Sequence, residues 1–174
     1  MATFKIDAAH SEVTFKVRHL MISNVTGSFN SFEGTLESDK EDFSDAKINF
    51  SADVNSISTN NEQRDGHLKS DDFFSADKFP KLTFTSTKVE KDGDEFTLTG
   101  DLTIRDVTKP VTLDVTYNGT VTDPYGQVKA GFEIAGKISR KEYGLTWHAV
   151  TETGSVMVSD DVKLSMNIQV VKQA

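Results

Sequence analysis

The sequence lacks cysteine altogether, so disulfide bonds and thiol chemistry contribute nothing to its stability or function. It also has no linker rich in proline, glycine and serine, no internal repeat and no low-complexity tract. A chain of 174 residues is close to the size of one domain and is long enough to bury a hydrophobic core without disulfides. We therefore expect residues 1–174 to form a single domain.

Positive charge is scarce in this chain. It has 19 Lys and Arg residues against 27 Asp and Glu residues, which gives a net charge of −8. A surface of this sign repels the phosphate backbone of nucleic acids and anionic lipid headgroups. We therefore expect no nucleic-acid partner and no electrostatic docking on membranes.

Long hydrophobic runs are also missing. No stretch approaches the roughly 18 apolar residues of a membrane-spanning helix, so we expect no stable membrane insertion. The segment from Met1 to Asp7 has a charge at Lys5 and no apolar stretch of the roughly 7–15 residues found in signal peptides. We expect the chain as printed to be cytoplasmic.

What the sequence does have is an alternation of apolar and polar residues with a period of two, almost from end to end. Each alternating segment has one polar and one apolar face, as a single antiparallel sheet closed around its own core requires. We count about eight such strands joined by short loops, and we predict an all-β antiparallel barrel. The clearest alternating segments are 11–20, 46–54, 96–104, 111–117, 128–138 and 162–170.

Three segments interrupt this alternation or keep only part of it. Between Phe29 and Phe32 the pattern slips by one residue, which predicts a bulge or a sharp bend. From Ser58 to Pro80 it stops, and Thr59-Asn60-Asn61-Glu62 has the form of a capping box. In the third segment, 141–159, the residues Tyr143, Leu145 and Trp147 fall on one side, which predicts further extended structure.

The capping box predicts a short helical excursion near residues 60–79. A helix is expected from Asn61 to about Ser70, followed by a single turn from Ser75 to Phe79 that ends at Pro80. Because the segment offers few apolar residues to pack on the barrel, we expect it to cover one mouth of the barrel.

The inward face of the predicted barrel combines large and small residues. Phe15, Phe50, Phe84 and Phe132 occur alongside small residues at positions 46, 52, 100, 130 and 136. Unfilled space in a protein interior is costly, so a ligand that fills the barrel would remove this cost. The alternative is that large residues interdigitate with the small ones and leave no cavity.

The nature of a ligand follows from this lining. Almost no inward position carries a charge, so a sugar or a nucleotide would lose its hydrogen bonds there, whereas a hydrocarbon chain would lose nothing. We therefore expect a long unbranched or isoprenoid lipid inside the barrel.

No group of residues has the spacing of a catalytic or metal site. His10, His19, His67 and His148 are scattered, and neither a zinc motif nor a Gly-x-Ser-x-Gly element occurs. In the segment 64–67, an Asp and a His lie two positions apart and do not face each other on a helix, so this segment is interpreted as a solvated helix surface. We expect no catalytic residue, no metal and no cofactor.

Arg18 and His19 have the strongest case among the polar residues, because they end a strand beside the apolar run Leu20-Met21-Ile22. An arginine at a barrel mouth is suited to bind a headgroup oxygen, and an ion pair with a carboxylate is an equal alternative. The residues that we expect to contact the lipid are Phe15, Val17, Arg18, His19, Leu20, Phe50, Leu68, Phe73, Phe84, Leu102, Phe132, Ile134 and Trp147.

Several blocks of the sequence strongly resemble the YceI-like family, in order and spacing, from about Phe4 to Val171. The resemblance implies a lipocalin-like barrel and a bacterial protein that binds a polyisoprenoid, an isoprenoid quinone or a fatty-acid derivative. It further implies transport or storage of the lipid, often by a homodimer. The blocks are Ala9-His10-Ser11, Val17-Arg18-His19-Leu20-Met21-Ile22-Ser23, Arg64-Asp65-Gly66-His67-Leu68-Lys69-Ser70, Asp72-Phe73-Phe74, Phe79-Pro80, Leu102-Thr103-Ile104, Val107-Thr108-Lys109-Pro110-Val111 and Gly131-Phe132.

This chain departs from the family pattern at four positions. The family usually has Trp at Phe4, Gly at Asp106, Asn at Ser139 and Phe at Tyr143. None of these departures touches the inward alternation, so the lipid hypothesis stands.

Two other functions are alternatives to lipid binding. The first is an enzyme that acts on a lipid-like substrate, with His19 or His67 as its base. The second is a structural or stress-related dimer whose interior is filled by side chains. The expected function is lipid binding without catalysis.

Overall fold

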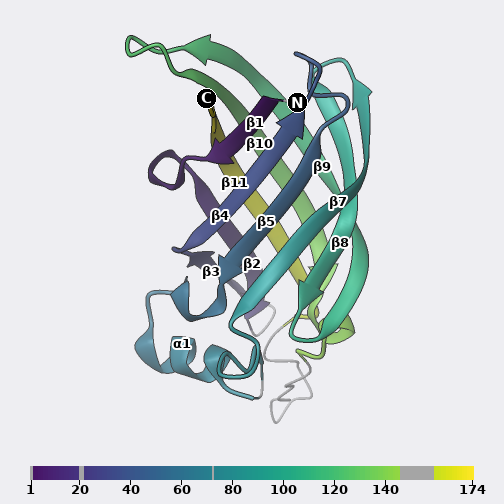
Figure 1. The fold of residues 1–174 in the computed structure, drawn as a ribbon. Coiled ribbons are helices and arrows are strands. Elements are labelled where there is room, and N and C mark those ends of the chain that lie inside the picture. Colours follow the sequence, from purple (N-terminus) through teal and green to yellow (C-terminus); the bar gives the residue numbers. More distant parts are fainter. Residues whose placement is uncertain (1, 20–21, 72, 146–158) are drawn as a thin grey trace.

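Antiparallel pairing joins the strands into one closed sheet (Figure 1). The computed structural model describes residues 2–19, 22–71, 73–145 and 159–174. The helices in these ranges are α1 (Glu62–Lys69) and the 3-10 helices η1 (Ala8–His10), η2 (Val54–Ser56) and η3 (Arg140–Tyr143). The strands are β1 (Ala2–Ile6), β2 (Glu12–His19), β3 (Ser23–Phe29), β4 (Phe32–Ser38), β5 (Lys47–Asp53), β6 (Ile57–Ser58), β7 (Lys81–Asp92), β8 (Glu95–Ile104), β9 (Val107–Thr122), β10 (Val128–Ser139) and β11 (Asp161–Lys172).

Strand β11 closes the barrel by pairing with β1 and β2 in succession. Phe4–Ile6 of β1 lie opposite 170–172 of β11, and Glu12–Lys16 of β2 lie opposite 163–167. Strands β1 and β2 are therefore two halves of one strand that η1 interrupts. In the same way β3 continues into β4, and β5 continues into β6 across η2. Counted in this way the barrel has eight antiparallel strands, which confirms the predicted fold.

The apolar side of the alternation faces the interior. In β8, for example, Phe96, Leu98, Leu102 and Ile104 are all buried, whereas Asp101 between them is exposed. Residues that lie opposite each other on neighbouring strands point to the same face of the sheet. The same alternation of inward and outward side chains therefore continues around the barrel. The sheet therefore has an apolar inner surface and a polar outer one, as the sequence predicts.

The helical excursion lies at one end of the barrel, where Figure 1 shows α1 below the strands. Its predicted capping box is wrong, because the N-cap is Asn61, whose Oδ1 accepts a hydrogen bond from the Arg64 N–H at 3.0 Å. The Thr59 hydroxyl instead donates to Asp65 Oδ1 at 2.6 Å. The predicted turn is present, since the N–H groups of residues 78 and 79 both donate to the Ser75 carbonyl.

Two other predictions have different outcomes. The bend predicted between Phe29 and Phe32 coincides with the break between β3 and β4. The extended structure predicted after Lys141 is wrong at its start, where η3 ends with Gly144 at φ 80° and the Leu145 N–H donates to the Arg140 carbonyl. Trp147 and the rest of 146–158 lie outside the described residues.

Gly100 provides the space that a neighbouring ring occupies in the barrel wall. A Cβ atom placed on it would lie 2.4 Å from Phe84 Cζ and 2.6 Å from the Thr85 carbonyl oxygen. Both distances are far below a van der Waals contact, and one of them is to backbone. Only a residue without a side chain therefore fits beside the Phe84 ring.

Gly100→Ala is expected to lower the free energy of unfolding by about 1–3 kcal/mol, because the new methyl group overpacks this site. Gly131→Ala is the matched control, since its Cβ would meet only Asn118 Cβ at 3.8 Å. Chemical denaturation of both variants measures the difference. Equal stability of the two variants would contradict the tight packing at Gly100.

Candidate functional site

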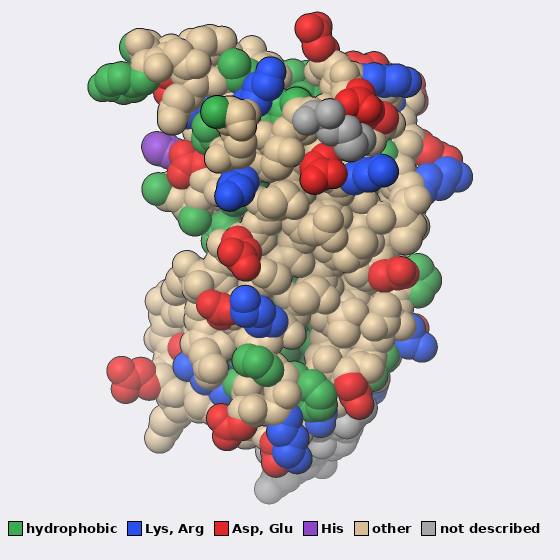
Figure 2. All heavy atoms as spheres, viewed as in Figure 1, with side chains coloured by type: hydrophobic (Ala, Val, Ile, Leu, Met, Phe, Trp, Pro, Cys, Tyr) green, Lys and Arg blue, Asp and Glu red, His purple; other side chains and the backbone are tan. Residues whose placement is uncertain are grey.

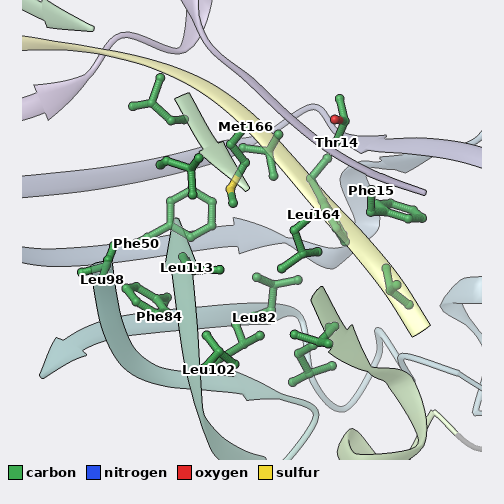
Figure 3. Close-up of a pocket in the computed structure, with 18 of the residues that line it drawn as sticks. Thr14, Phe15, Phe50, Leu82, Phe84, Leu98, Leu102, Leu113, Leu164 and Met166 are labelled. Atoms are coloured by element: carbon green, nitrogen blue, oxygen red, sulfur yellow. The ribbon is translucent and has the colours of Figure 1, made fainter. Parts of the chain in front are cut away.

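The barrel encloses a cavity of about 570 Å³. Its wall is built from aliphatic and aromatic side chains of most of the strands. Figure 3 shows Phe50, Phe84, Leu113 and Met166 among the side chains that line it, with almost no polar atoms. A cavity of this size falls within the range of small-ligand sites in proteins. The predicted alternative of a filled interior is wrong.

Phe43 closes the end of the cavity that is remote from α1. It lies in the connection between β4 and β5, has a φ of 61° and is only 4% exposed. Its ring makes edge contacts with Phe4, Tyr117 and Phe132 at centroid distances of 5.4, 5.5 and 5.5 Å. Edge-to-face packing of this kind adds to the energy of burial. Phe43 therefore forms an apolar plug that belongs to the cavity wall.

Polar side chains gather at the opposite end of the cavity. They come from α1, from the segment that leads into it and from η3, and all three lie at the same end of the barrel in Figure 1. The polar lining residues at this end are Thr59, Asn61, Gln63, Arg64, His67 and Arg140. The cavity is thus amphipathic along its length, with a plug of phenylalanine at one end and hydrogen-bonding groups at the other.

Hydrogen bonds fix Arg64 against the segment before α1. Its Nε donates to Thr59 Oγ1 and its Nη2 donates to the Thr59 carbonyl, both at 2.7 Å. His67 lies one helical turn further along, where its ring makes an edge contact with Phe73 at 5.1 Å. A guanidinium and an imidazole on one face of a helix are suited to bind an oxygen-containing headgroup.

Arg140 is a buried cation, only 3% exposed, in the cavity wall. Its Nε donates to the Ser159 carbonyl at 2.9 Å and its Nη1 donates to the Leu145 carbonyl at 2.7 Å. Burial lowers the pKa of the guanidinium from its ordinary value, and the nearby Asp160 carboxylate opposes this shift. Arg140 therefore holds the chain before and after 146–158 at the polar end of the cavity.

Most of the predicted contact residues lie in the cavity wall, and their contact with a ligand stays a prediction. Arg18 does not lie there: it is exposed on β2, because its neighbour Val17 takes the inward position. His19 pairs through its backbone with Ser23, and its side chain lies outside the described part, as do Leu20 and Trp147. The predicted residues in the wall are Phe15, Val17, Phe50, Leu68, Phe73, Phe84, Leu102, Phe132 and Ile134.

Sequence reasoning missed that polar residues of α1 line the cavity. Arg64 and His67 were expected on a solvated helix surface, whereas both line the cavity. The available signal was their spacing of three residues, which places them on one face of a helix that was itself expected to cover the mouth. Phe43 was missed too, since it stands alone among acidic and polar residues.

The small inward residues do not create the cavity. Of those at positions 46, 52, 100, 130 and 136, only Ala46 lines it. Phe84 fills the space over Gly100, and Leu113 fills the space over Gly136, where a Cβ would lie 2.4 Å from Leu113 Cδ2. The interdigitation that the alternative predicts is therefore present at these positions, but it leaves a cavity beside it.

Two searches of the described residues complete the site. None of the helices in these residues is long and apolar enough to cross a membrane. The same part of the chain contains no group of three or more His, Cys, Asp or Glu side chains placed to hold a metal ion.

Comparison with known proteins places this site in a family. A sequence model of the YceI-like domain matches residues 4–170. The chain belongs to the YceI-like family. Protein YceI of Salmonella newport (strain SL254) is 42% identical over 174 residues, which cover 99% of this chain and 88% of that protein.

Solved structures show the same fold as this YceI-like chain. The YceI protein of Campylobacter jejuni matches with a TM-score of 0.77 at 37% identity, over 97% of this chain and 96% of that one. Burkholderia cenocepacia BcnA has a TM-score of 0.82 at 22% identity, over 94% and 98% of the two chains. A polyisoprenoid-binding domain from Saccharophagus degradans has a TM-score of 0.70 at 16% identity, over 98% of both chains.

Arg140→Met is expected to lower the free energy of unfolding by about 2–4 kcal/mol, because the buried Leu145 carbonyl and the half-buried Ser159 carbonyl lose their donor. Lys141→Met, next to it on the exposed side, is the control and is expected to change stability by less than about 0.5 kcal/mol. Urea denaturation of the two variants tests this. A neutral result for Arg140→Met would show that water satisfies these carbonyls.

Proposed function

We propose that this YceI-like protein binds a long apolar lipid inside the barrel, as a polyisoprenoid, an isoprenoid quinone or a fatty-acid derivative. The observation that carries the proposal is the cavity of about 570 Å³ inside the barrel, with its hydrocarbon wall. Burial of a lipid tail there gains about 25 cal/mol per Å² of apolar surface removed from water. The name of the Saccharophagus degradans domain, which describes polyisoprenoid binding, supports the same ligand class.

The two ends of the cavity give the lipid an orientation. The tail points toward the Phe43 plug, because an apolar chain loses no hydrogen bonds there. The head lies near Arg64, His67 and Arg140, whose polar side chains line this end of the cavity. This orientation replaces the predicted headgroup contact of Arg18, whose side chain lies outside the cavity wall.

We further propose transport or storage of the lipid, without a catalytic step and without a cofactor, by a homodimer. A rival enzyme would use His67, which does line the cavity. It would require turnover of the bound lipid that disappears in His67→Gln. Recovery of the lipid with its mass unchanged after prolonged incubation supports carriage, and a product that depends on His67 would support the enzyme.

Ile134→Asp is expected to weaken lipid binding at least roughly a hundredfold, because it places an unpaired charge against the lipid tail. Ile134 is half-buried and lines the cavity, whereas its neighbour Ala135 is exposed. Ala135→Asp therefore adds the same charge on the outer face and is expected to keep wild-type binding. Native mass spectrometry with an added long-chain isoprenoid quinone measures both.

The same experiment tests the proposal itself. Circular dichroism spectra and melting curves first establish that both variants are folded. If the wild-type protein carries no lipid after mild purification and takes up none of the offered quinone, the binding function is wrong.

Phe43→Ala is expected to shift the preference of the protein toward longer chains, because the plug at the tail end is removed. Phe43→Leu keeps an apolar side chain of similar bulk at the same position and is expected to retain the wild-type preference. Competition among isoprenoid quinones of increasing chain length, read by native mass spectrometry, gives the preference. An unchanged preference in Phe43→Ala would place the tail elsewhere.

A further inference from the structure

Three lysines stand side by side across three neighbouring strands on the outer face of the barrel. Lys137 of β10 lies directly opposite Lys163 of β11, and Lys163 lies directly opposite Lys16 of β2. All three side chains are exposed. We call Lys16, Lys137 and Lys163 the lysine row.

The lysine row is not explained by the stability of the sheet. Like charges directly opposite each other on neighbouring strands are destabilising. Lys137 approaches Asp161 at 3.7 Å, with both side chains 62% exposed. Within the described residues, Lys16 and Lys163 form no ion pair. Such a concentration of positive charge is unexpected on a chain whose net charge is −8.

The row borders a concavity of about 700 Å³ on the outer wall. Its floor consists of small side chains, because Ala135 pairs with Ser165 and Ser165 pairs with Thr14 in the adjacent register. The hydroxyl groups of Thr26, Thr112 and Ser165 line it, together with one carboxylate, Asp114. Thr14 lines it too, but its hydroxyl donates to the Ser165 carbonyl at 2.7 Å. Ammonium and hydroxyl donors around a shallow hollow are suited to bind phosphate oxygens.

The concavity lies close to the polar end of the lipid cavity. Lys137 is near the end of β10, which leads into η3, and Lys163 is near the start of β11. Figure 1 shows η3 at the same end of the barrel as α1. Thr14, Phe15 and Leu164 line both the inner cavity and the outer concavity, so the two hollows share part of the barrel wall.

The described residues over β4, β5 and β7 carry charges of mixed sign. Figure 2 shows the face over β4, β5 and β7, where Lys and Arg side chains are interspersed with Asp and Glu. A surface of mixed sign gives little attraction to an anionic partner. The lysine row therefore gives its own side of the barrel a local attraction for anions, although the net charge of the chain is negative.

We propose that the lysine row docks the barrel on an anionic phospholipid bilayer, with lipid phosphate groups in the concavity. The choice of a bilayer rests on the proposed function, since a lipid carrier must meet a membrane at the end where its ligand enters. The net negative charge of the chain favours an orientation in which the lysine row faces the bilayer. Net charge alone predicts no electrostatic docking on membranes, because it does not describe how the lysines are arranged on one side of the barrel.

A flotation assay with the full chain tests the docking. Wild-type protein is expected to bind vesicles of phosphatidylcholine that contain roughly 30 mol% phosphatidylglycerol, because the anionic lipid gives them a negative surface potential. It is expected not to bind vesicles of pure phosphatidylcholine. Binding is expected to fall as salt rises, since the interaction is screened. The variant Lys16→Gln, Lys137→Gln, Lys163→Gln is expected to bind at least roughly tenfold more weakly, because each lysine near an anionic surface contributes about 1 kcal/mol.

A matched triple variant, Lys5→Gln, Lys47→Gln, Lys91→Gln, separates the row from net charge. These three lysines are exposed on other strands, and their loss changes the net charge by the same amount. It is expected to bind vesicles as the wild type does. Equal loss in both triple variants would overturn the proposal, and so would equal binding to neutral vesicles.

Two further measurements separate a loss of docking from a loss of folding and from a failure of the lipid-binding proposal. Replacing the lysine row is expected to leave the melting temperature unchanged or to raise it, since like charges are removed. Native mass spectrometry on the same samples is expected to show unchanged occupancy by the quinone in detergent solution. Vesicle binding that persists without any lipid uptake supports the docking surface and rejects the lipid-carrier function. Tight binding to polyglutamate without vesicle binding would instead assign the row to an acidic protein.

Discussion

The pairing of β11 with both β1 and β2 is the constraint on which the rest of the structure depends. It closes the sheet, so that no strand edge is left open along this seam. Closure also turns a local property, the alternation of side chains, into a global separation of an inner surface from an outer one. An open sheet with the same sequence would present its apolar face to water. The cavity and the charged exterior are therefore two results of a single set of backbone pairings.

The barrel itself is predictable from sequence because the alternation of inward and outward side chains, here called parity, is a local property. Each apolar residue fixes the face of its neighbours on the same strand. The excursion at α1 is predictable for the same reason, as the place where parity stops. Its cap is not, because the Thr59 hydroxyl is taken by Asp65 and the Thr59 carbonyl by Arg64, which leaves Asn61 to cap the helix. The turn at η3 depends on Arg140, whose buried guanidinium bonds Ser159 across the chain. A contact of this range leaves no periodic signal.

The cavity was predicted from the small inward residues, but those residues are not its cause. Phe84 and Leu113 from neighbouring strands pack over Gly100 and Gly136. The space at these two glycines is therefore filled by side chains. The space that remains follows from the diameter of an eight-stranded barrel, which is at the boundary between a filled interior and a ligand site. The polar end was harder to predict. Helix α1 buries none of its residues, so no apolar stripe indicates which of its faces is turned to the cavity.

The lysine row shows what parity and composition each leave undetermined. Parity places Lys16, Lys137 and Lys163 on the outer face, and composition says only that they are outnumbered by carboxylates. That they meet depends on the register between β2, β10 and β11, which is set by the same closure that forms the cavity. A shift of register by two residues along β11 would keep every face correct and would separate Lys163 from both neighbours. The outer row and the inner cavity therefore depend on one register, which ties a charged surface to the end where the lipid is proposed to enter.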